Sequence, residues 1–274
     1  MLLSGIAAVS ILIAAGWMVL GHLPVWQAVL VFLGSDVCLF LLAAAFLGIM
    51  CLAVDPDKPQ EHDSKFYRRM MDIYIEALIR LVGIRLHTQG LEQTPKEGRF
   101  LLVCNHLFVA DPGILLHCFR NSQLAFVTKQ ENQKIPIVGK IMHKILCQNI
   151  NRDNDREALK TILKCIQLIR DDEVSIGIFP EGYTSKDGFL HSFRPGAFKI
   201  AQKTKVPIVV CTIQGTRKLI PNMLHLRRTD VRLHLVEVIP PESYEGMTTV
   251  QLSDLVHEKM LADLGESFRM PHGE

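Results

Sequence analysis

The chain has 274 residues, 49% of them hydrophobic, and a formal net charge of +2. This length and composition provide apolar material for one large or two small domains with a sizeable core. The charges are distributed unevenly, which argues against a single soluble domain. Residues 1–54 contain no lysine or arginine and one acid, Asp36, whereas all 30 basic residues and the other acids follow. The chain is therefore predicted to divide near residue 55.

Two long apolar runs occupy the first part. Residues 2–20 and 37–54 carry no charge, and each is close to the roughly 20 residues that cross a hydrocarbon core. We expect a membrane-embedded helical hairpin over residues 1–54. A cleaved signal peptide is the alternative for the first run, but no basic segment precedes it and a second apolar run follows. A helix over residues 25–54 would exceed the core thickness, so it should either tilt or break at residues 34–36.

Asp36 is the one acid of the hairpin. A carboxylate at mid-bilayer costs at least about 2.5–3.5 kcal/mol, so we favour an interfacial position, in a hairpin that re-enters one leaflet, over a functional intramembrane acid. The positive-inside rule places the part of the chain after the hairpin in the cytoplasm, because basic residues follow the second run closely: Lys58, Lys65, Arg68 and Arg69.

Strands and helices alternate after a linker at residues 55–65. Residues 66–81 show the spacing of an amphipathic helix, beside the bilayer or simply at the surface. The predicted strands are 100–104, 124–128, 174–179, 207–213 and 231–239, with helices from residue 112 and around 136–146, 155–169 and 195–203. Continuous β-branched runs are typical of strands buried on both faces. Residues 66–274 are therefore predicted to form an α/β domain, with a mixed or mostly parallel sheet covered by helices.

The seven cysteines are odd in number, include no C-x-x-C pair and mostly lie in apolar runs. These features are typical of reduced cysteines that serve packing. We expect neither a disulfide bond nor a metal site.

Polar residues follow two of the predicted strands. His106 comes just after one strand, five residues before Asp111, and Glu181 and Gly182 come just after another. Ligands of open α/β sheets bind beyond strand ends, so the two groups indicate a shared cleft. Gly182 permits a sharp turn and the close approach of a ligand. The structural alternative for Asp111, which precedes Pro112, is a helix N-cap before a first-turn proline.

At these residues the chain resembles the membrane-bound glycerolipid acyltransferases, of the 1-acylglycerol-3-phosphate acyltransferase (PlsC) type. The family's N-H-x4-D motif is matched at Asn105, His106 and Asp111, and its F-P-E-G motif at residues 179–182. The resemblance covers roughly residues 66–265, with further matches in the same order at Lys129, Glu131, Pro136, Gly139, Arg152, Val206, Pro207 and Ile208. Two such motifs behind an apolar hairpin make a specific signal.

The resemblance implies transfer of a fatty acyl group from acyl-CoA or acyl carrier protein to the free hydroxyl of a lysophospholipid, with 1-acylglycerol-3-phosphate giving phosphatidic acid. A neutral imidazole suits removal of the hydroxyl proton, so His106 is the predicted base. Asp111 would fix the imidazole tautomer and stabilise the imidazolium, as the acid of a Ser-His-Asp triad does. No protein nucleophile, cofactor or nucleic acid partner is expected.

Further residues are predicted to contact the substrates. Lys129 or backbone N–H groups would meet the oxyanion that develops on the thioester. Glu181, beside Gly182, would orient the acceptor, and Arg152 would bind its phosphate with a planar fork of donors. Arg194 precedes the next predicted helix and would give a second phosphate contact. The alternatives are a surface lysine at Lys129, a solvated charge at Arg152, and an Arg194 that only packs its stem on the neighbours of Phe193.

The chain also departs from the family pattern, most clearly where an arginine that helps to hold a phosphate is commonly found. The departures are Leu146, Asn149 and Asn151 in the second motif and Tyr183 and Thr184 after the third. They leave glycerol-3-phosphate or another lysolipid open as the acceptor. A membrane-anchored hydrolase, with His106, Asp111 and Glu181 as metal ligands, and a non-catalytic membrane scaffold are the alternatives from other functional classes.

Overall fold

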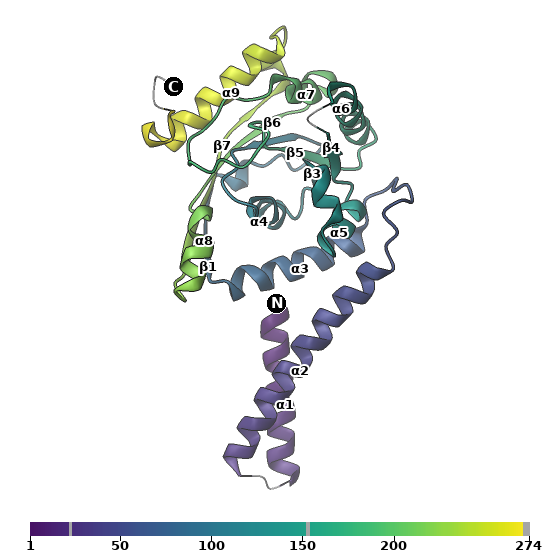
Figure 1. Ribbon diagram of the computed structural model, residues 1–274, viewed down its shortest axis with the longest axis vertical. Coiled ribbons are helices and arrows are strands. Elements are labelled where there is room, and N and C mark those ends of the chain that lie inside the picture. The colour runs from purple at the N-terminus through teal and green to yellow at the C-terminus, as the bar shows by residue number, and fades with distance from the viewer. Residues whose placement is uncertain (22–23, 152–153, 271–274) are drawn as a thin grey trace.

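The computed structural model describes residues 1–21, 24–151 and 154–270 (Figure 1). Among these residues, seven strands form one sheet in the order β1-β7-β6-β2-β5-β3-β4. Neighbouring strands are parallel except β6 and β7. The strands are β1 (Ile84–Gln89), β2 (Leu101–Cys104), β3 (Leu124–Lys129), β4 (Gln148–Ile150), β5 (Ser175–Ile178), β6 (Ile208–Gln214) and β7 (Thr229–Ile239). The mostly parallel sheet predicted from the sequence is confirmed.

Burial explains which strands the sequence revealed. Every residue of β2 and β5 is buried, as are all but the last of β6, because helices cover both faces of the sheet centre. The two strands that the sequence analysis missed are the sheet edges. Most residues of β1 are exposed, and β4 has three residues, so neither contains the apolar run that marks a buried strand.

Helices cover the sheet in two layers (Figure 1). Figure 1 shows α3, α4 and α5 between the sheet and the N-terminal hairpin, with α6, α7 and α9 on the opposite side. The helices of the domain are α3 (Lys65–Leu81), α4 (Asp111–Cys118), α5 (Val138–Lys144), α6 (Asp155–Arg170), α7 (Lys199–Thr204), α8 (Leu219–Leu224) and α9 (Thr249–Leu264). The helix predicted around residues 195–203 is a 3-10 turn, Pro195–Phe198, that continues into α7.

Helix α9 was not predicted, although its start carries a recognisable signal. Thr248 and Gln251 form a capping box, in which the Gln251 N–H donates to Thr248 Oγ1 at 3.2 Å and the Thr248 N–H donates to Gln251 Oε1 at 2.9 Å. The T-x-x-Q pattern before an apolar run could have located this helix.

Helices α1 (Leu2–Gly21) and α2 (Val25–Leu52) project from the domain as a pair (Figure 1). Both are long and apolar enough to cross a membrane by length and composition, and only 11% and 0% of their most hydrophobic windows is buried. The expected apolar hairpin is thus present. α2 continues through residues 34–36, so the long helix does not break there. Asp36 lies opposite the middle of α1, with its Oδ1 3.4 Å from Ser10 Oγ, and whether the hairpin spans or re-enters stays a prediction.

The C-terminal end of α2 packs on the domain. Cys51 and Val54 are 2% and 3% exposed. The hydroxyl of Tyr67 donates to the Met50 carbonyl at 2.9 Å, and that of Tyr74 donates to the Ala43 carbonyl at 2.6 Å. Because both tyrosines belong to α3, the last turns of α2 are fixed to the first helix of the domain.

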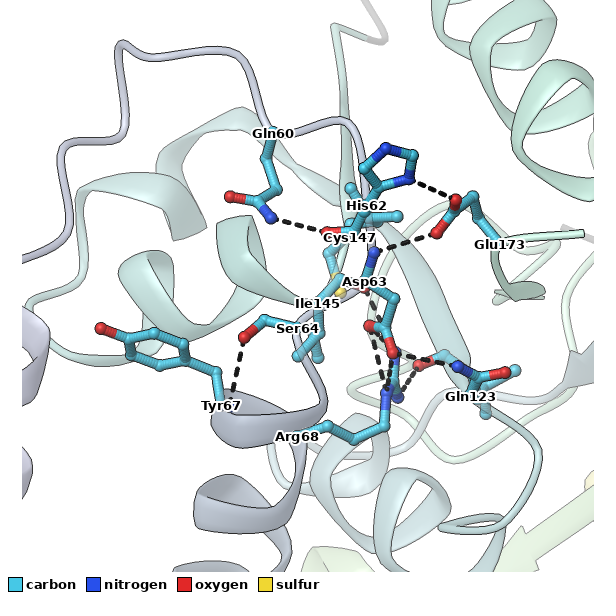
Figure 2. Close-up of polar contacts among 12 residues, drawn as sticks. Gln60, His62, Asp63, Ser64, Tyr67, Arg68, Gln123, Ile145, Cys147 and Glu173 are labelled. Carbon is cyan, nitrogen blue, oxygen red and sulfur yellow. Dashed lines mark hydrogen bonds and ion pairs between the residues drawn. The ribbon is translucent and has the colours of Figure 1, made fainter. Parts of the chain in front are cut away.

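Residues 60–64 of the linker are also fastened to the domain (Figure 2). The buried Arg68 guanidinium donates to Asp63 Oδ1 at 2.6 Å and to the Leu124 carbonyl at 2.8 Å. His62 Nδ1 lies 2.6 Å from Glu173 Oε1, and the Asp63 N–H donates to Glu173 Oε2 at 3.0 Å. The end of the linker is therefore held against the starts of β3 and β5. The predicted boundaries, 1–54, 55–65 and 66–274, stay a prediction about independent folding.

Deletion of residues 1–54 should release the domain partly from membranes and leave the His106 site intact, because the hairpin contains no motif residue. Loss of the buried side chains of Cys51, at the end of α2, and of Val54, just after it, should cost about 2 kcal/mol. This cost lowers the melting temperature by roughly 4–8 °C for a domain of this size. Membrane flotation and thermal unfolding measure both effects. Deletion of residues 1–42 is the matched control, because it keeps both tyrosine contacts. A chain lacking residues 1–54 that does not fold would contradict the boundary.

Candidate active site

The site begins where β2 ends. The Asn105 side chain pairs with the backbone of β6: its Nδ2 donates to the Ile213 carbonyl at 3.0 Å, and its Oδ1 accepts from the Ile213 N–H at 2.8 Å. This amide satisfies buried backbone groups that would otherwise lack partners. It also fixes the position from which the loop continues to His106. The sequence indicates Asn105 only as a motif residue, and this positioning role was not predicted.

His106 and Asp111 form a hydrogen-bonded pair. The Asp111 side chain is fully buried, and its Oδ2 accepts from His106 Nδ1 at 2.9 Å. The same oxygen accepts the backbone N–H groups of Leu107 and Phe108, both at 2.7 Å. Because a carboxylate oxygen only accepts, Nδ1 carries the ring proton of the neutral imidazole and Nε2 keeps a lone pair. The N-cap of α4 is Ala110, without a side-chain cap bond, so the helix-cap alternative for Asp111 is wrong.

Aromatic rings hold the imidazole from one face. The Phe179 ring stacks on His106, with centroids 4.1 Å apart and planes 20° apart, and the Phe126 ring stacks on Phe179 at 5.2 Å. Gly177 makes room for this stack, because a Cβ at that position would lie 2.6 Å from the Phe126 ring. The His106 side chain remains 15% exposed. The ring is thus held in one orientation while one part of it reaches solvent.

Glu181 connects two loops of the site. It is 1% exposed, and its Oε1 and Oε2 accept the backbone N–H groups of His106 at 2.9 Å and of His191 at 3.1 Å. Burial raises the pKa of Glu181, and the hydrogen bonds from the two N–H groups act in the opposite direction. The Ser185 N–H also donates to the His106 carbonyl at 2.8 Å. Glu181 therefore positions His106, and its predicted contact with the acceptor stays a prediction.

Gly182 makes the sharp turn expected from the sequence. Its φ is 82°, in the left-handed region that favours glycine, and its N–H donates to the Phe179 carbonyl at 3.0 Å. A Cβ at residue 182 would lie 2.7 Å from Arg194 Nε. The group that approaches this turn closely is therefore the side chain of Arg194.

Arg194 and Gly182 line a cavity of about 570 Å³. Arg194 is exposed, and its guanidinium makes no hydrogen bond or ion pair with another described residue. Arg152 lies outside the described residues, so its predicted phosphate contact stays a prediction. The described residues near it in the chain, Ile150 and Asp155, line the same cavity.

Lys129 is not part of this cluster in the structure. It ends β3, and its Nζ lies 3.1 Å from Glu131 Oε1, with the two side chains 58% and 63% exposed. No hydrogen bond or ion pair between described residues joins Lys129 to His106 or its neighbours. The predicted contact of Lys129 with an oxyanion stays a prediction.

The loop after Gly182 is held by a network that the sequence analysis missed. His191 Nε2 lies 3.0 Å from both carboxylate oxygens of Asp187. Burial raises the pKa of Asp187, but hydrogen bonds from His191, the Phe189 N–H and the Ser185 hydroxyl outweigh this effect and hold that pKa at about 2. Arg217 Nη1 donates to the Asp187 carbonyl at 2.8 Å. The loop that bears His191 is thereby fixed next to Glu181.

A second cavity, of about 520 Å³, lies on the other face of β3. Successive strand residues point to opposite faces: Val127 lines the first cavity, whereas Phe126 and Thr128 line the second. Mostly apolar side chains complete its wall, from α2, α3, α4, α5 and α8, among them Leu47, and from the loop before α4, among them Phe108. Its walls come from helices, strands and loops that are far apart in the chain, so no sequence motif predicts this cavity.

Comparisons with known proteins agree with the motifs. A family model described as Acyltransferase matches residues 85–214. A 1-acyl-sn-glycerol-3-phosphate acyltransferase of Borreliella burgdorferi is 29% identical over 180 residues, which cover 64% of this chain and 71% of that protein. The chloroplastic 1-acyl-sn-glycerol-3-phosphate acyltransferase BAT2 of Brassica napus is 33% identical over 160 residues, 57% of this chain and 46% of that protein. Over the matched residues the chain is similar to acyltransferases of the PlsC type.

A solved structure shares the fold. The crystal structure of the 1-acyl-sn-glycerophosphate (LPA) acyltransferase PlsC from Thermotoga maritima superposes with a TM-score of 0.62, at 23% identity, over 84% of this chain and 90% of that chain. The matched segment spans less than half the length of the Brassica relative. The identity of the substrates of this chain therefore depends on its own site.

Proposed function

We propose that this protein is a membrane O-acyltransferase of phospholipid biosynthesis. It transfers a fatty acyl group from an acyl thioester, acyl-CoA or acyl carrier protein, to the free hydroxyl of 1-acylglycerol-3-phosphate and so gives phosphatidic acid. The observation that carries the proposal is the 2.9 Å contact between His106 Nδ1 and Asp111 Oδ2, because it leaves Nε2 as a base. Both relatives described above are 1-acyl-sn-glycerol-3-phosphate acyltransferases, which supports the choice of acceptor.

The reaction needs one proton to move twice. Nε2 of His106 takes the proton of the acceptor hydroxyl as that oxygen attacks the thioester carbonyl carbon. Asp111 stabilises the resulting imidazolium, and backbone N–H groups or Lys129 meet the oxyanion. When the tetrahedral intermediate collapses, the C–S bond breaks and the thiolate takes the proton from Nε2. The products are an ester and a free thiol, without an acyl-enzyme.

The apolar cavity supports a lipid substrate. Each CH₂ group that moves from water into such a cavity contributes about 0.8 kcal/mol, so a long acyl chain gains much of its binding free energy there. Phe126 lines the cavity and stacks on Phe179, which stacks on His106. An acyl chain in the cavity would therefore end close to the proposed base.

The location of the domain follows from the hairpin and its flank. Two apolar helices and the membrane-bound family support a membrane protein. We place the catalytic domain on the cytoplasmic side, because Lys58, Lys65 and Arg69 follow the hairpin and basic residues near a membrane segment mark the cytoplasmic side. The expectation of no nucleic acid partner stays a prediction.

The proposed function is tested by incubating the detergent-solubilised full chain with a panel of lysolipids, glycerol-3-phosphate and labelled acyl donors. We expect labelled phosphatidic acid from 1-acylglycerol-3-phosphate, at a rate that a chelator leaves unchanged. Release of labelled fatty acid without a new ester, abolished by the chelator, would support the membrane-anchored hydrolase instead. A chain that gives no product with any pair would be a scaffold.

Phosphate recognition is tested at Arg194. Loss of a charge-assisted contact costs about 1.5–3 kcal/mol, so Arg194→Ala should raise KM for 1-acylglycerol-3-phosphate roughly ten- to a hundred-fold and change KM for the acyl donor less. We expect the same of Arg152→Ala. Arg85→Ala, an exposed arginine on the edge strand β1, is the matched control and should change neither constant. Normal KM values in both variants would show that the acceptor is not recognised by its phosphate, and another lysolipid head group would then be favoured.

A further inference from the structure

Residues 216–228 carry exposed apolar side chains on a short stretch. This segment comprises a 3-10 turn (Thr216–Lys218), α8 and the turn that leads into β7. Leu224 and Leu226 are 73% and 97% exposed, and Ile220 and Met223 are 49% and 44% exposed. Apolar side chains that are exposed together mark an interaction surface. Leu226 forms the tip of the turn, with a φ of 52°.

The same segment is basic. It contains Arg217, Lys218, Arg227 and Arg228 and no acidic residue. Arg217 donates a hydrogen bond to the Asp187 carbonyl. The other three cations form no ion pair with a carboxylate among the described residues. An apolar tip flanked by unpaired cations complements an anionic lipid surface, whose phosphates are negative and whose interior is apolar.

The segment lies at the edge of the domain that faces the hairpin. Figure 1 shows α8 beside β1 at the same end of the domain as α3, and the hairpin extends from that end. Ile220 and Met223 of α8 line the apolar cavity, whose wall also includes Leu47 of α2 and Leu78 of α3. Since α2 is a candidate membrane helix, α8 and the membrane hairpin border one cavity.

We propose that residues 223–228, the α8 tip, form a second membrane contact, separate from the hairpin and directed to an anionic bilayer. Leu224 and Leu226 insert among the lipid chains at the interface, while Arg227 and Arg228 meet lipid phosphates. The hairpin and the α8 tip together hold the border of the apolar cavity against the bilayer. A lipid can then pass from the bilayer into the cavity without crossing water. This inference rests on the proposed membrane location and not on the acyl transfer itself.

The test uses the full chain with Cys38→Ser, because Cys38 is an exposed cysteine that would otherwise react with the fluorophore. Leu226→Cys carries an environment-sensitive fluorophore, and the protein is reconstituted in vesicles of phosphatidylcholine and phosphatidylglycerol that contain nitroxide lipid. Lys205→Cys is the matched control, because Lys205 is also exposed and has a φ of 53°, but follows α7 on the opposite side of the sheet (Figure 1). We expect the nitroxide lipid to quench more than half of the emission at residue 226 and to leave residue 205 unchanged.

The charges are tested in the same vesicles. The pair Arg227→Glu and Arg228→Glu should remove most of the quenching at residue 226, as should vesicles of pure phosphatidylcholine. Equal quenching at residues 226 and 205 would overturn the proposal, and undiminished quenching in pure phosphatidylcholine would overturn the choice of an anionic surface. A blue shift at residue 226 in detergent, without lipid quenching in vesicles, would mean that protein covers the tip and would also overturn it. Acyl transfer to detergent-dispersed acceptor, measured separately, shows whether the proposed function stands.

Discussion

Replacement of His106 by alanine should abolish acyl transfer in a protein that folds normally, and Asp111→Asn should lower kcat by about four orders of magnitude, as loss of the tautomer-fixing acid does in a triad enzyme. Without Nε2 the site lacks the base proposed to accept the hydroxyl proton. An asparagine carbonyl oxygen can take the place of Oδ2, which accepts all three N–H groups, but a neutral amide cannot stabilise the imidazolium by charge.

A second histidine pair supplies the control. His117 Nδ1 lies 2.7 Å from Asp72 Oδ1, with side chains 17% and 21% exposed, and the pair joins α4 to α3 outside the site. We expect His117→Ala to retain transfer. The comparison then distinguishes loss of the base from any general effect of breaking a buried histidine–aspartate pair. Initial rates and thermal unfolding are measured on each variant. Transfer at the wild-type rate by a folded His106→Ala protein would disprove the mechanism.

Glu181→Gln should lower kcat roughly ten- to a hundred-fold while KM for both substrates changes little. In the wild type each carboxylate oxygen accepts one backbone N–H. A glutamine must turn its NH₂ group toward one of these N–H groups, which leaves a buried donor unsatisfied at a cost of about 1–3 kcal/mol. The backbone at His106 or at His191 then shifts, and the base with it.

Glu173→Gln is the matched variant for this experiment. Glu173 also accepts a backbone N–H, that of Asp63 at 3.0 Å, but at the linker rather than in the site (Figure 2). It should lower stability and leave kcat unchanged. A Glu181→Gln protein with normal kcat and a raised KM for the acceptor would contradict the positioning role and would favour the direct acceptor contact that the sequence suggested.

The centre of the fold could be predicted from the sequence because its strands are buried on both faces. β2, β5 and β6 are continuous apolar runs, and no other element of comparable length suits them. β1 and β4 were missed because edge strands are defined by their pairing with β7 and β3, and that pairing leaves little trace in the side chains. α8 was missed for a related reason: three of its four large apolar residues, Ile220, Met223 and Leu224, are exposed rather than buried in a core.

The site was predictable where one residue type has to do the chemistry. The spacing of His106 and Asp111 in one loop was enough to pair them. The roles of Asn105 and Glu181 were not visible, because both side chains bind backbone groups of segments distant in the chain, at Ile213, His106 and His191. Only the fold brings those groups within reach. The place of Arg194 beside Gly182 was anticipated in part, from its position shortly after the Glu181 loop.

In the proposed mechanism, His106 activates the acceptor hydroxyl for direct attack on an acyl thioester. The most direct measurement is mass spectrometry of the lipids formed when wild-type and His106→Ala proteins are incubated with 1-acylglycerol-3-phosphate and an isotope-labelled acyl thioester. We expect phosphatidic acid with one labelled chain from the wild type and none from the variant. Equal amounts of labelled phosphatidic acid from both proteins, or labelled free fatty acid as the sole product of the wild type, would contradict it.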